Sequence, residues 1–177
     1  PELTANNEKF HRLLTEGIPI EHQKDGKTRG DLAWLVDFKN PENNEYWVVN
    51  QFTVIEDSKN KRPDLVLFVN GLPLVVIELK NATDENATLR SAFKQLQTYK
   101  RAIPSLFTYN GLLIISDGLE ARAGSLSAGF SRFMAWKAEV ESGTRVEPEL
   151  GSLIQHLLVP SVLLDLIRHF TVFDKSK

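Results

Sequence analysis

Two apolar runs joined by a tight turn, with charged residues at their outer ends, constrain this chain most. Residues 65–69 and 74–77 lie on either side of Asn70-Gly71, a dipeptide typical of β-hairpin turns. Successive residues of a strand point to opposite faces, so both faces of this hairpin are apolar and each needs a covering layer. Helical periodicity before and after the hairpin supplies those layers. The sequence therefore predicts a three-layer α/β fold with a central mixed β-sheet flanked by helices.

Periodicity and turn residues locate the other elements. Helices are predicted at 5–16, ended by Gly17, at 86–101, ended before Pro104, at 130–141, and at 149–158 and 161–170, separated by Pro160. Strands are predicted at 32–38 and 46–55, joined as a hairpin by turn residues 39–45, and at 111–116, whereas 119–129 is predicted to be a surface loop. We divide the chain into a domain at 1–142 and a helical extension at 143–177.

Composition excludes several classes of protein. The 177 residues include no cysteine, which excludes a disulfide framework and a thiolate metal site. No apolar run approaches the ~18 residues of a membrane span, and the first residues are too polar for a secretory signal. The formal net charge of −2 argues against an autonomous high-affinity DNA-binding protein, but not against a nuclease inside a larger assembly.

The turn brings two acids together. Asp64 lies seven residues before Gly71 and Glu78 lies seven after it, so the folded hairpin places them nearly opposite, within one residue of register. Directly opposed side chains are ~5 Å apart at Cβ. Lys80 lies two residues beyond Glu78 and points to the same face, whereas the side chain of Leu79 points away and leaves its backbone carbonyl beside the site.

These charges favour a bound cation. Two carboxylates ~5 Å apart repel by roughly 3 kcal/mol at an effective dielectric constant of ~20, and a divalent cation reverses the sign of that energy. Oxygens of Asp64, Glu78 and the Leu79 carbonyl, together with water, suit Mg²⁺, which polarises a phosphoryl oxygen and acidifies a bound water. Lys80 can orient or deprotonate that water, or neutralise charge on the phosphorane. The competing interpretation, an exposed Glu-x-Lys pair beside an ordinary turn, is disfavoured by the apolar flanks of both acids.

Pro63-Asp64 followed by Glu78-Leu79-Lys80 resembles the motif of the PD-(D/E)xK nuclease superfamily. A longer set of segments resembles the N-terminal nuclease region of the restriction (R) subunit of type I restriction enzymes. The resemblance runs over nearly the whole chain. It includes residues 10–14, 48–54, 62–81, 95–100, 103–104, 106–107, 116–118 and 133–137, and the predicted helix that contains 163–165.

The resemblance implies a restriction-endonuclease-like fold and a Mg²⁺-dependent endonuclease that hydrolyses phosphodiester bonds of double-stranded DNA. Carried over by position, Asp64 and Glu78 are metal ligands, Lys80 is the catalytic lysine, and Gln95 and Tyr99 form the Gln-xxx-Tyr element of this nuclease branch. Positions four apart share a helix face, so both can reach a phosphate or orient the lysine and the metal ligands. In this family the domain works with modification and specificity subunits, in the cytoplasm of a bacterium or archaeon.

The family also implies an ATP-driven DNA translocase fused to the nuclease. No G-x-x-x-x-G-K-[ST] phosphate loop occurs in this sequence, so we assign no ATP binding to it and interpret the chain as the nuclease portion, with 143–177 leading to the motor. Two alternatives stay open: a non-catalytic docking module of the same complex, and another PD-(D/E)xK nuclease that acts in repair or recombination.

Several residues outside the motif are further candidates. Glu8, on the first predicted helix, can approach the metal, or it is a solvated helix charge. Six basic residues are candidate phosphate contacts, although each also fits ordinary surface charge: Lys59, Lys61, Arg62, Lys94, Lys100 and Arg101. Trp34, Trp47 and Trp136 are predicted to be core residues rather than base-stacking platforms, and the four histidines have no metal-ligand spacing.

Overall fold

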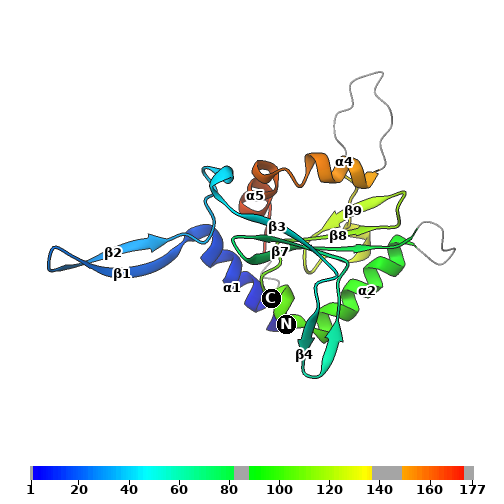
Figure 1. The fold of residues 1–177 in the computed structure, drawn as a ribbon, viewed down its shortest axis with the longest axis horizontal. Coiled ribbons are helices and arrows are strands. Elements are labelled where there is room, and N and C mark those ends of the chain that lie inside the picture. Colours follow the sequence, from blue (N-terminus) through cyan, green and yellow to red (C-terminus); the bar gives the residue numbers. More distant parts are fainter. Residues whose placement is uncertain (1, 82–87, 137–148, 174–177) are drawn as a thin grey trace, which may run out of the picture.

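The central sheet is mixed, as predicted. A computed structural model describes residues 2–81, 88–136 and 149–173 of the chain. Five strands lie in the order β3-β6-β7-β8-β9 (Figure 1). They are β3 (Tyr46–Asn50), β6 (Leu65–Val69), β7 (Leu72–Leu79), β8 (Leu112–Ser116) and β9 (Ala121–Gly124). All neighbouring strands are antiparallel except β7 and β8, which are parallel. The predicted hairpin around Asn70-Gly71 is formed by β6 and β7.

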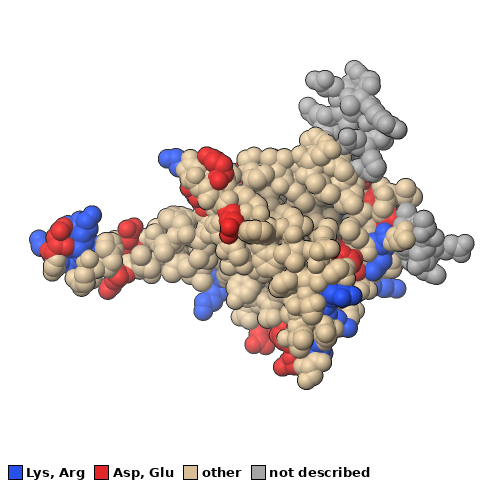
Figure 2. All heavy atoms as spheres, in the orientation of Figure 1, with Lys and Arg blue, Asp and Glu red and all other residues tan. Residues whose placement is uncertain are grey.

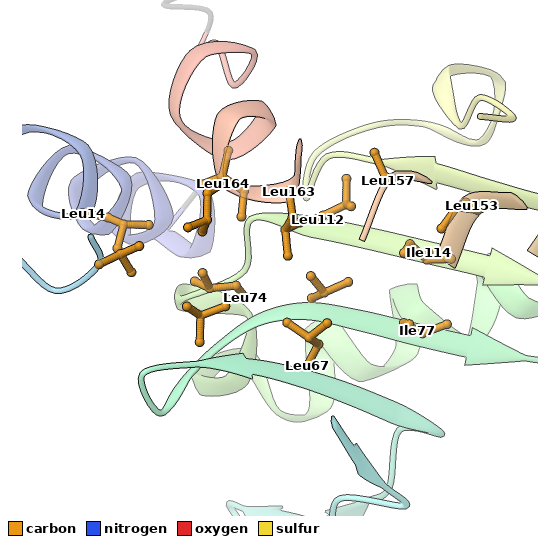
Figure 3. Packing of buried hydrophobic residues seen from close by; sticks show 14 of the residues in the cluster. Leu14, Leu67, Leu74, Ile77, Leu112, Ile114, Leu153, Leu157, Leu163 and Leu164 are labelled. Atoms are coloured by element: carbon orange, nitrogen blue, oxygen red, sulfur yellow. The ribbon is translucent and has the colours of Figure 1, made fainter. Parts of the chain in front are cut away.

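One face of the sheet is covered by the N-terminal and C-terminal helices. These are α1 (Glu2–Glu16), α4 (Glu149–His156) and α5 (Pro160–His169). Their buried leucines, among them Leu14, Leu153 and Leu163, pack against Leu67 and Ile77 of the sheet, as Figure 3 shows. Each fully buried leucine or isoleucine stabilises the fold by roughly 1.5–3 kcal/mol relative to an exposed one. The predicted C-terminal helices are thus confirmed, and they form part of the main core.

The other face is covered by α2 (Leu89–Ala102) and α3 (Pro104–Thr108). The side chain of Thr88 accepts a hydrogen bond from the backbone of Ser91, and this capping box begins α2. Leu96 of α2 is fully buried against Val66 and Val76, which point to this face of β6 and β7. Helices therefore lie on both sides of the sheet, and the predicted three-layer α/β architecture is confirmed.

An extra residue in β7 sets the register of the central hairpin. Next to the turn, Phe68 pairs with Pro73, but Leu67 pairs with Val75, so Leu74 has no partner on β6. Such a β-bulge shifts every later residue of the strand by one position relative to its partner.

The carbonyl of the bulged Leu74 is satisfied from the neighbouring strand. It accepts hydrogen bonds from the backbone N–H of Gly111 at 2.8 Å and from the side-chain amide of Asn110 at 3.3 Å. Asn110 is buried and also donates to the carbonyl of Leu112 at 2.8 Å. The bulge is therefore held by the start of β8, and β8 in turn is parallel to β7.

The region before β3 folds differently from the prediction. β1 (Ile18–Lys24) and β2 (Lys27–Ala33) form a separate hairpin that projects from the body of the molecule (Figure 1). The predicted hairpin of 32–38 with 46–55 is wrong, because 34–38 contains no strand and β3 pairs with β6. Asn44 accepts a hydrogen bond from the backbone N–H of Asp37 and donates one to its carbonyl, both at 2.8 Å. These bonds close the segment as a compact loop, so it cannot serve as a strand connection.

A second small hairpin divides the predicted strand at 46–55. β3 ends at Asn50, and Gln51 has a positive φ of 53° that turns the chain. β4 (Val54–Glu56) and β5 (Lys59–Lys61) then pair with each other, and Glu56 accepts hydrogen bonds from the backbone and hydroxyl of Ser105 at the start of α3. This hairpin leads directly into Asp64.

Two predictions after β8 are wrong. Residues 121–124 form β9 where a loop is predicted, and 130–136 form only a short 3₁₀ turn, η2 (Phe130–Arg132), before Met134 pairs with Ala123. A Cβ at Gly124 would lie 2.7 Å from the ring of Phe133, so the missing side chain lets this segment close on β9. The rest of the predicted helix, 137–141, and the predicted boundary between 142 and 143 lie outside the described residues.

In the described part of the chain, no single helix has the length and apolarity to cross a membrane. α4 and α5 together meet those two criteria, but the chain bends by 82° between them.

Candidate functional site

The bulge places both acids on the α2 side of the sheet. Leu65 pairs with Ile77, so Asp64, just before β6, comes opposite Glu78. Without the extra residue, Asp64 would instead come opposite Ile77, and the two acids would point to different faces. Glu78 follows the buried Val76 by two positions, so it points toward α2.

Asp64 is held by two donors, one directly after β3 and one on β7. Its Oδ1 accepts a hydrogen bond from the side-chain amide of Gln51, and its Oδ2 accepts one from the backbone N–H of Leu79, both at 2.8 Å. The backbone N–H of Gln51 also donates to the carbonyl of Asp64 at 2.8 Å. The aspartate is therefore fixed at the point where β3, β6 and β7 end or begin.

Glu78 is a buried acid with only part of its hydrogen-bonding capacity used. It is 1% exposed, and its Oε1 accepts a hydrogen bond from the ammonium group of Lys80 at 2.8 Å. Its Oε2 has no hydrogen-bond partner among the described residues. Burial raises the pKa of Glu78 to about 7, against the lowering effect of Lys80 and with a further raising effect of Asp64. The site thus buries a carboxyl group whose negative form lacks sufficient compensation.

Tyr99 and Gln95 connect α2 to this acid pair. The side-chain amide of Gln95 donates to the hydroxyl of Tyr99 at 2.7 Å, and that hydroxyl lies 3.4 Å from the carbonyl of Arg62. Burial raises the pKa of Tyr99, and the charges of Glu78 and Asp64 raise it further. The phenol of Tyr99 therefore lies close enough to interact electrostatically with both carboxylates.

The donor set fits a hard, hydrated cation. Two carboxylates on one face, one with an oxygen that lacks a partner in the described part of the chain, provide oxygen ligands of the kind Mg²⁺ prefers. The described residues contain no group of three or more His, Asp or Glu side chains at metal-binding spacing, so ligands other than such side chains would complete the coordination of an ion there. Leu79 lies beside the pair, since its N–H reaches Asp64, and its carbonyl stays a predicted ligand.

Glu8 lies away from the acid pair. It forms an ion pair with Arg12 on α1 at 2.7 Å. It lines a cavity together with Asn110 and Gly111, which precede β8, whereas Glu78 lies at the far end of the parallel strand β7. The structure therefore gives Glu8 a partner on its own helix and no contact with the acid pair.

Most of the predicted basic residues remain exposed. Lys and Arg side chains gather over α2 in Figure 2, on the side of the molecule that carries the acid pair. Lys59, Arg62, Lys94 and Arg101 are exposed and Lys61 is half-buried. Lys100 differs, because its ammonium group donates to the carbonyl of Leu126 at 2.8 Å, and its pKa is lowered by burial and by Arg101.

The tryptophan prediction is only partly right. Trp136 packs against the core, but Trp34 is 50% exposed and Trp47 is 59% exposed. Trp47 lies on β3, an edge strand on which the neighbouring Val48 is also exposed, and Trp34 follows the projecting β1–β2 hairpin. Helical and strand periodicity predict burial only where a covering layer exists.

Sequence reasoning did not single out Gln51. It falls inside the predicted strand at 46–55 and inside the segment 48–54 that carries the family resemblance, and neither pattern assigns it a role. The assignment needs the register of β3 against β6, which brings Gln51 beside Asp64.

Comparison with known proteins gives a consistent result. A family model described as "Type I restriction enzyme R protein N terminus" matches residues 2–132. The chain is 45% identical to the type I restriction enzyme HindI endonuclease subunit of Haemophilus influenzae, over 99% of the chain and 17% of that protein. It is 31% identical to the putative type I restriction enzyme MjaIXP endonuclease subunit of Methanocaldococcus jannaschii, over 100% of the chain and 19% of that protein. The chain thus spans less than a fifth of the length of these relatives, and it belongs to the family of type I restriction enzyme R protein N-terminal regions.

Proposed function

We propose that this chain is the nuclease part of a type I restriction enzyme R subunit, and that it hydrolyses phosphodiester bonds of double-stranded DNA with Mg²⁺. The observation that carries the proposal is the buried, incompletely paired carboxyl group of Glu78, which lies opposite Asp64 and within 2.8 Å of Lys80. A carboxylate in such a position is costly unless a cation compensates it.

Asp64 and Glu78, with the Leu79 carbonyl, would hold the metal ion. When bound there, Mg²⁺ supplies polarisation of a phosphoryl oxygen and acidification of a bound water. In the hydrolysis, a water oxygen forms a new bond to phosphorus while the bond from phosphorus to the leaving oxygen breaks. Lys80 is placed to orient that water or to offset negative charge on the phosphorane.

Residues of α2 and β5 would position the DNA backbone. The hydroxyl of Tyr99 and the amide of Gln95 lie on the helix face that points to the acid pair, so they can bind a phosphate or orient Lys80. The exposed Lys59, Arg62 and Lys94 are suited to further phosphate contacts, which position a duplex without reading its sequence. Recognition of a DNA sequence would come from another subunit.

Family membership supports the proposal that the chain works inside a larger assembly. The matched relatives are named as endonuclease subunits of type I restriction enzymes. We infer that the chain acts in the cytoplasm with modification and specificity subunits, and that any ATP-driven motor lies in parts of such a protein beyond these residues.

The test combines cleavage with metal binding. Asp64→Ala, Glu78→Ala and Lys80→Ala in the full R subunit, assembled with its partners, are expected to abolish cleavage of plasmid DNA that carries a recognition site. Calorimetric titration of the chain with Mn²⁺ is expected to show a saturable site that Glu78→Ala removes. Wild-type cleavage by all three variants would refute the proposal, and a chain with no saturable Mn²⁺ site would favour a non-catalytic docking module.

A further inference from the structure

Gln51 is joined to Asp64 by both its backbone and its side chain. The backbone N–H of Gln51 donates to the carbonyl of Asp64 and its side-chain amide donates to Oδ1 of the same residue, each at 2.8 Å. β3 and β6 are adjacent, and Asn50 pairs with Leu65. This pairing brings Gln51 beside Asp64, within reach of a glutamine side chain.

The two donors to Asp64 fix the plane of its carboxylate. Rotation about the last side-chain bond of an aspartate is soft, so a single hydrogen bond leaves the oxygens poorly oriented. Gln51 holds Oδ1 from the β3 side and the backbone of Leu79 holds Oδ2 from the β7 side. Each oxygen accepts more than one hydrogen bond or ligand, so both keep a lone pair for a cation. Of the two donors, only that of Gln51 can be removed by a side-chain substitution.

The backbone conformation at Gln51 would favour glycine if the turn were the only role of this position. Its φ of 53° lies in the left-handed region, where glycine is the residue of lowest energy. A glycine would make the same turn and the same backbone hydrogen bond to Asp64. The side chain is therefore best explained by its contact with the carboxylate.

We infer that Gln51 is a positioning residue that orients the carboxylate of Asp64 for a divalent cation. This inference rests on the proposed metal-dependent function and deepens it, since it adds the residue that directly follows β3 to a site otherwise built around β6, β7 and α2. Groups that orient metal ligands typically contribute 10–100-fold to metal affinity or activity.

Calorimetric titration with Mn²⁺ tests the inference on the chain itself. Gln51→Gly removes the amide and relaxes the backbone, and Gln51→Met removes the amide at nearly constant length. Gln155→Met, at an exposed position of α4, is the matched control. We expect both Gln51 variants to bind Mn²⁺ about 10–100-fold more weakly, and the control to bind as the wild type does. The melting temperature of Gln51→Gly is expected not to fall, because the turn prefers glycine.

Each outcome decides between orientation of the carboxylate and a structural role. Weaker binding by Gln51→Gly with an unchanged or higher melting temperature supports the inference. Wild-type affinity in Gln51→Gly would overturn it, even if Gln51→Met were weakened, because strain alone would then explain the methionine variant. Asp64→Ala distinguishes the proposed metal site from the role of Gln51. If Asp64→Ala abolishes Mn²⁺ binding while Gln51→Gly binds Mn²⁺ as the wild type does, the proposed function stands and the role of Gln51 is refuted. A wild-type chain without a saturable site would overturn both.

Discussion

Without divalent cations, Glu78→Gln is expected to stabilise the chain at pH 8 and to have little effect at pH 4.5. The wild-type carboxyl group is 1% exposed, and burial raises its pKa from 4.5 to about 7. Glutamine keeps an oxygen that can accept the hydrogen bond of Lys80, but it carries no charge to bury.

The pH dependence follows from which state binds the proton more tightly. Between pH 4.5 and about 7 the folded chain keeps the Glu78 proton while the unfolded chain has lost it, so the free energy of unfolding falls as the pH rises. Above about pH 7 both states are ionised and the loss is complete. The difference between the two pKa values corresponds to a loss of about 3 kcal/mol in the free energy of unfolding. Solvent that reaches Lys80 and Asp64 on the open side of the site screens part of this charge, so we expect about 1–2 kcal/mol.

Urea denaturation in the presence of a chelator measures this difference. The free energy of unfolding of Glu78→Gln should exceed that of the wild type by about 1–2 kcal/mol at pH 8, and the excess should vanish toward pH 4.5. Glu21→Gln, an exposed position on β1, is the control and should show no such pH dependence. Equal differences between wild type and Glu78→Gln at both pH values would refute the reasoning. Saturating Mn²⁺ should then stabilise the wild type more than the variant, because only the wild type keeps both acids.

Two further substitutions test the surroundings of the site. Tyr99→Phe keeps the buried ring and removes the hydroxyl that accepts from Gln95, so cleavage by the assembled enzyme should fall about 10–100-fold, while the melting curve moves little. Gly124→Ala would place a Cβ 2.7 Å from the ring of Phe133, so urea denaturation should show a loss of about 1–3 kcal/mol, whereas Gly30→Ala, where an added Cβ meets nothing within 4 Å, should lose far less.

Sequence patterns predict the layers and the central hairpin because apolar periodicity reports burial directly. The runs on either side of Asn70-Gly71 become β6 and β7, and the apolar stripe of 86–101 becomes α2 from Leu89 onward. These elements contact each other across the core, so local pattern and tertiary packing agree. The closeness of Asp64 and Glu78 is predictable for the same reason, since both are counted from one turn.

Elements without a covering layer are less predictable. The exposed Trp34 follows a projecting hairpin and the exposed Trp47 lies on an edge strand, and apolar side chains in such places do not report burial. The loop from Asp37 to Asn44 depends on side-chain to backbone hydrogen bonds, and turn-rich sequence fits this loop as well as a hairpin connection. The contact of Gln51 with Asp64 depends on the pairing of β3 with β6, which joins residues that are separated in the sequence.

The one-residue uncertainty in register decides whether a site exists at all. Counting from the turn leaves Asp64 opposite either Ile77 or Glu78. A hairpin without a bulge would put it opposite Ile77 and send the two acids to different faces, whereas the bulge at Leu74 brings Glu78 into register. The sequence of residues 72–76 does not indicate a bulge. The bulge depends instead on distant residues, because Asn110 and Gly111 donate the hydrogen bonds that the carbonyl of Leu74 accepts.

Deletion of Leu74 tests this dependence directly. The shortened β7 must either carry Glu78 to the face covered by α4 and α5, or keep Glu78 on the α2 side and strain the turn. In both cases the chain loses a leucine that is 0% exposed. We expect a loss of about 2–5 kcal/mol in urea denaturation, and no saturable Mn²⁺ binding in the fraction that remains folded. Leu74→Ala keeps the bulge while losing comparable core volume, so it should be destabilised and yet retain the metal site. If the deletion variant bound Mn²⁺ as tightly as Leu74→Ala, the acids would not owe their common face to the bulge, and the geometric account of the site would have to be abandoned.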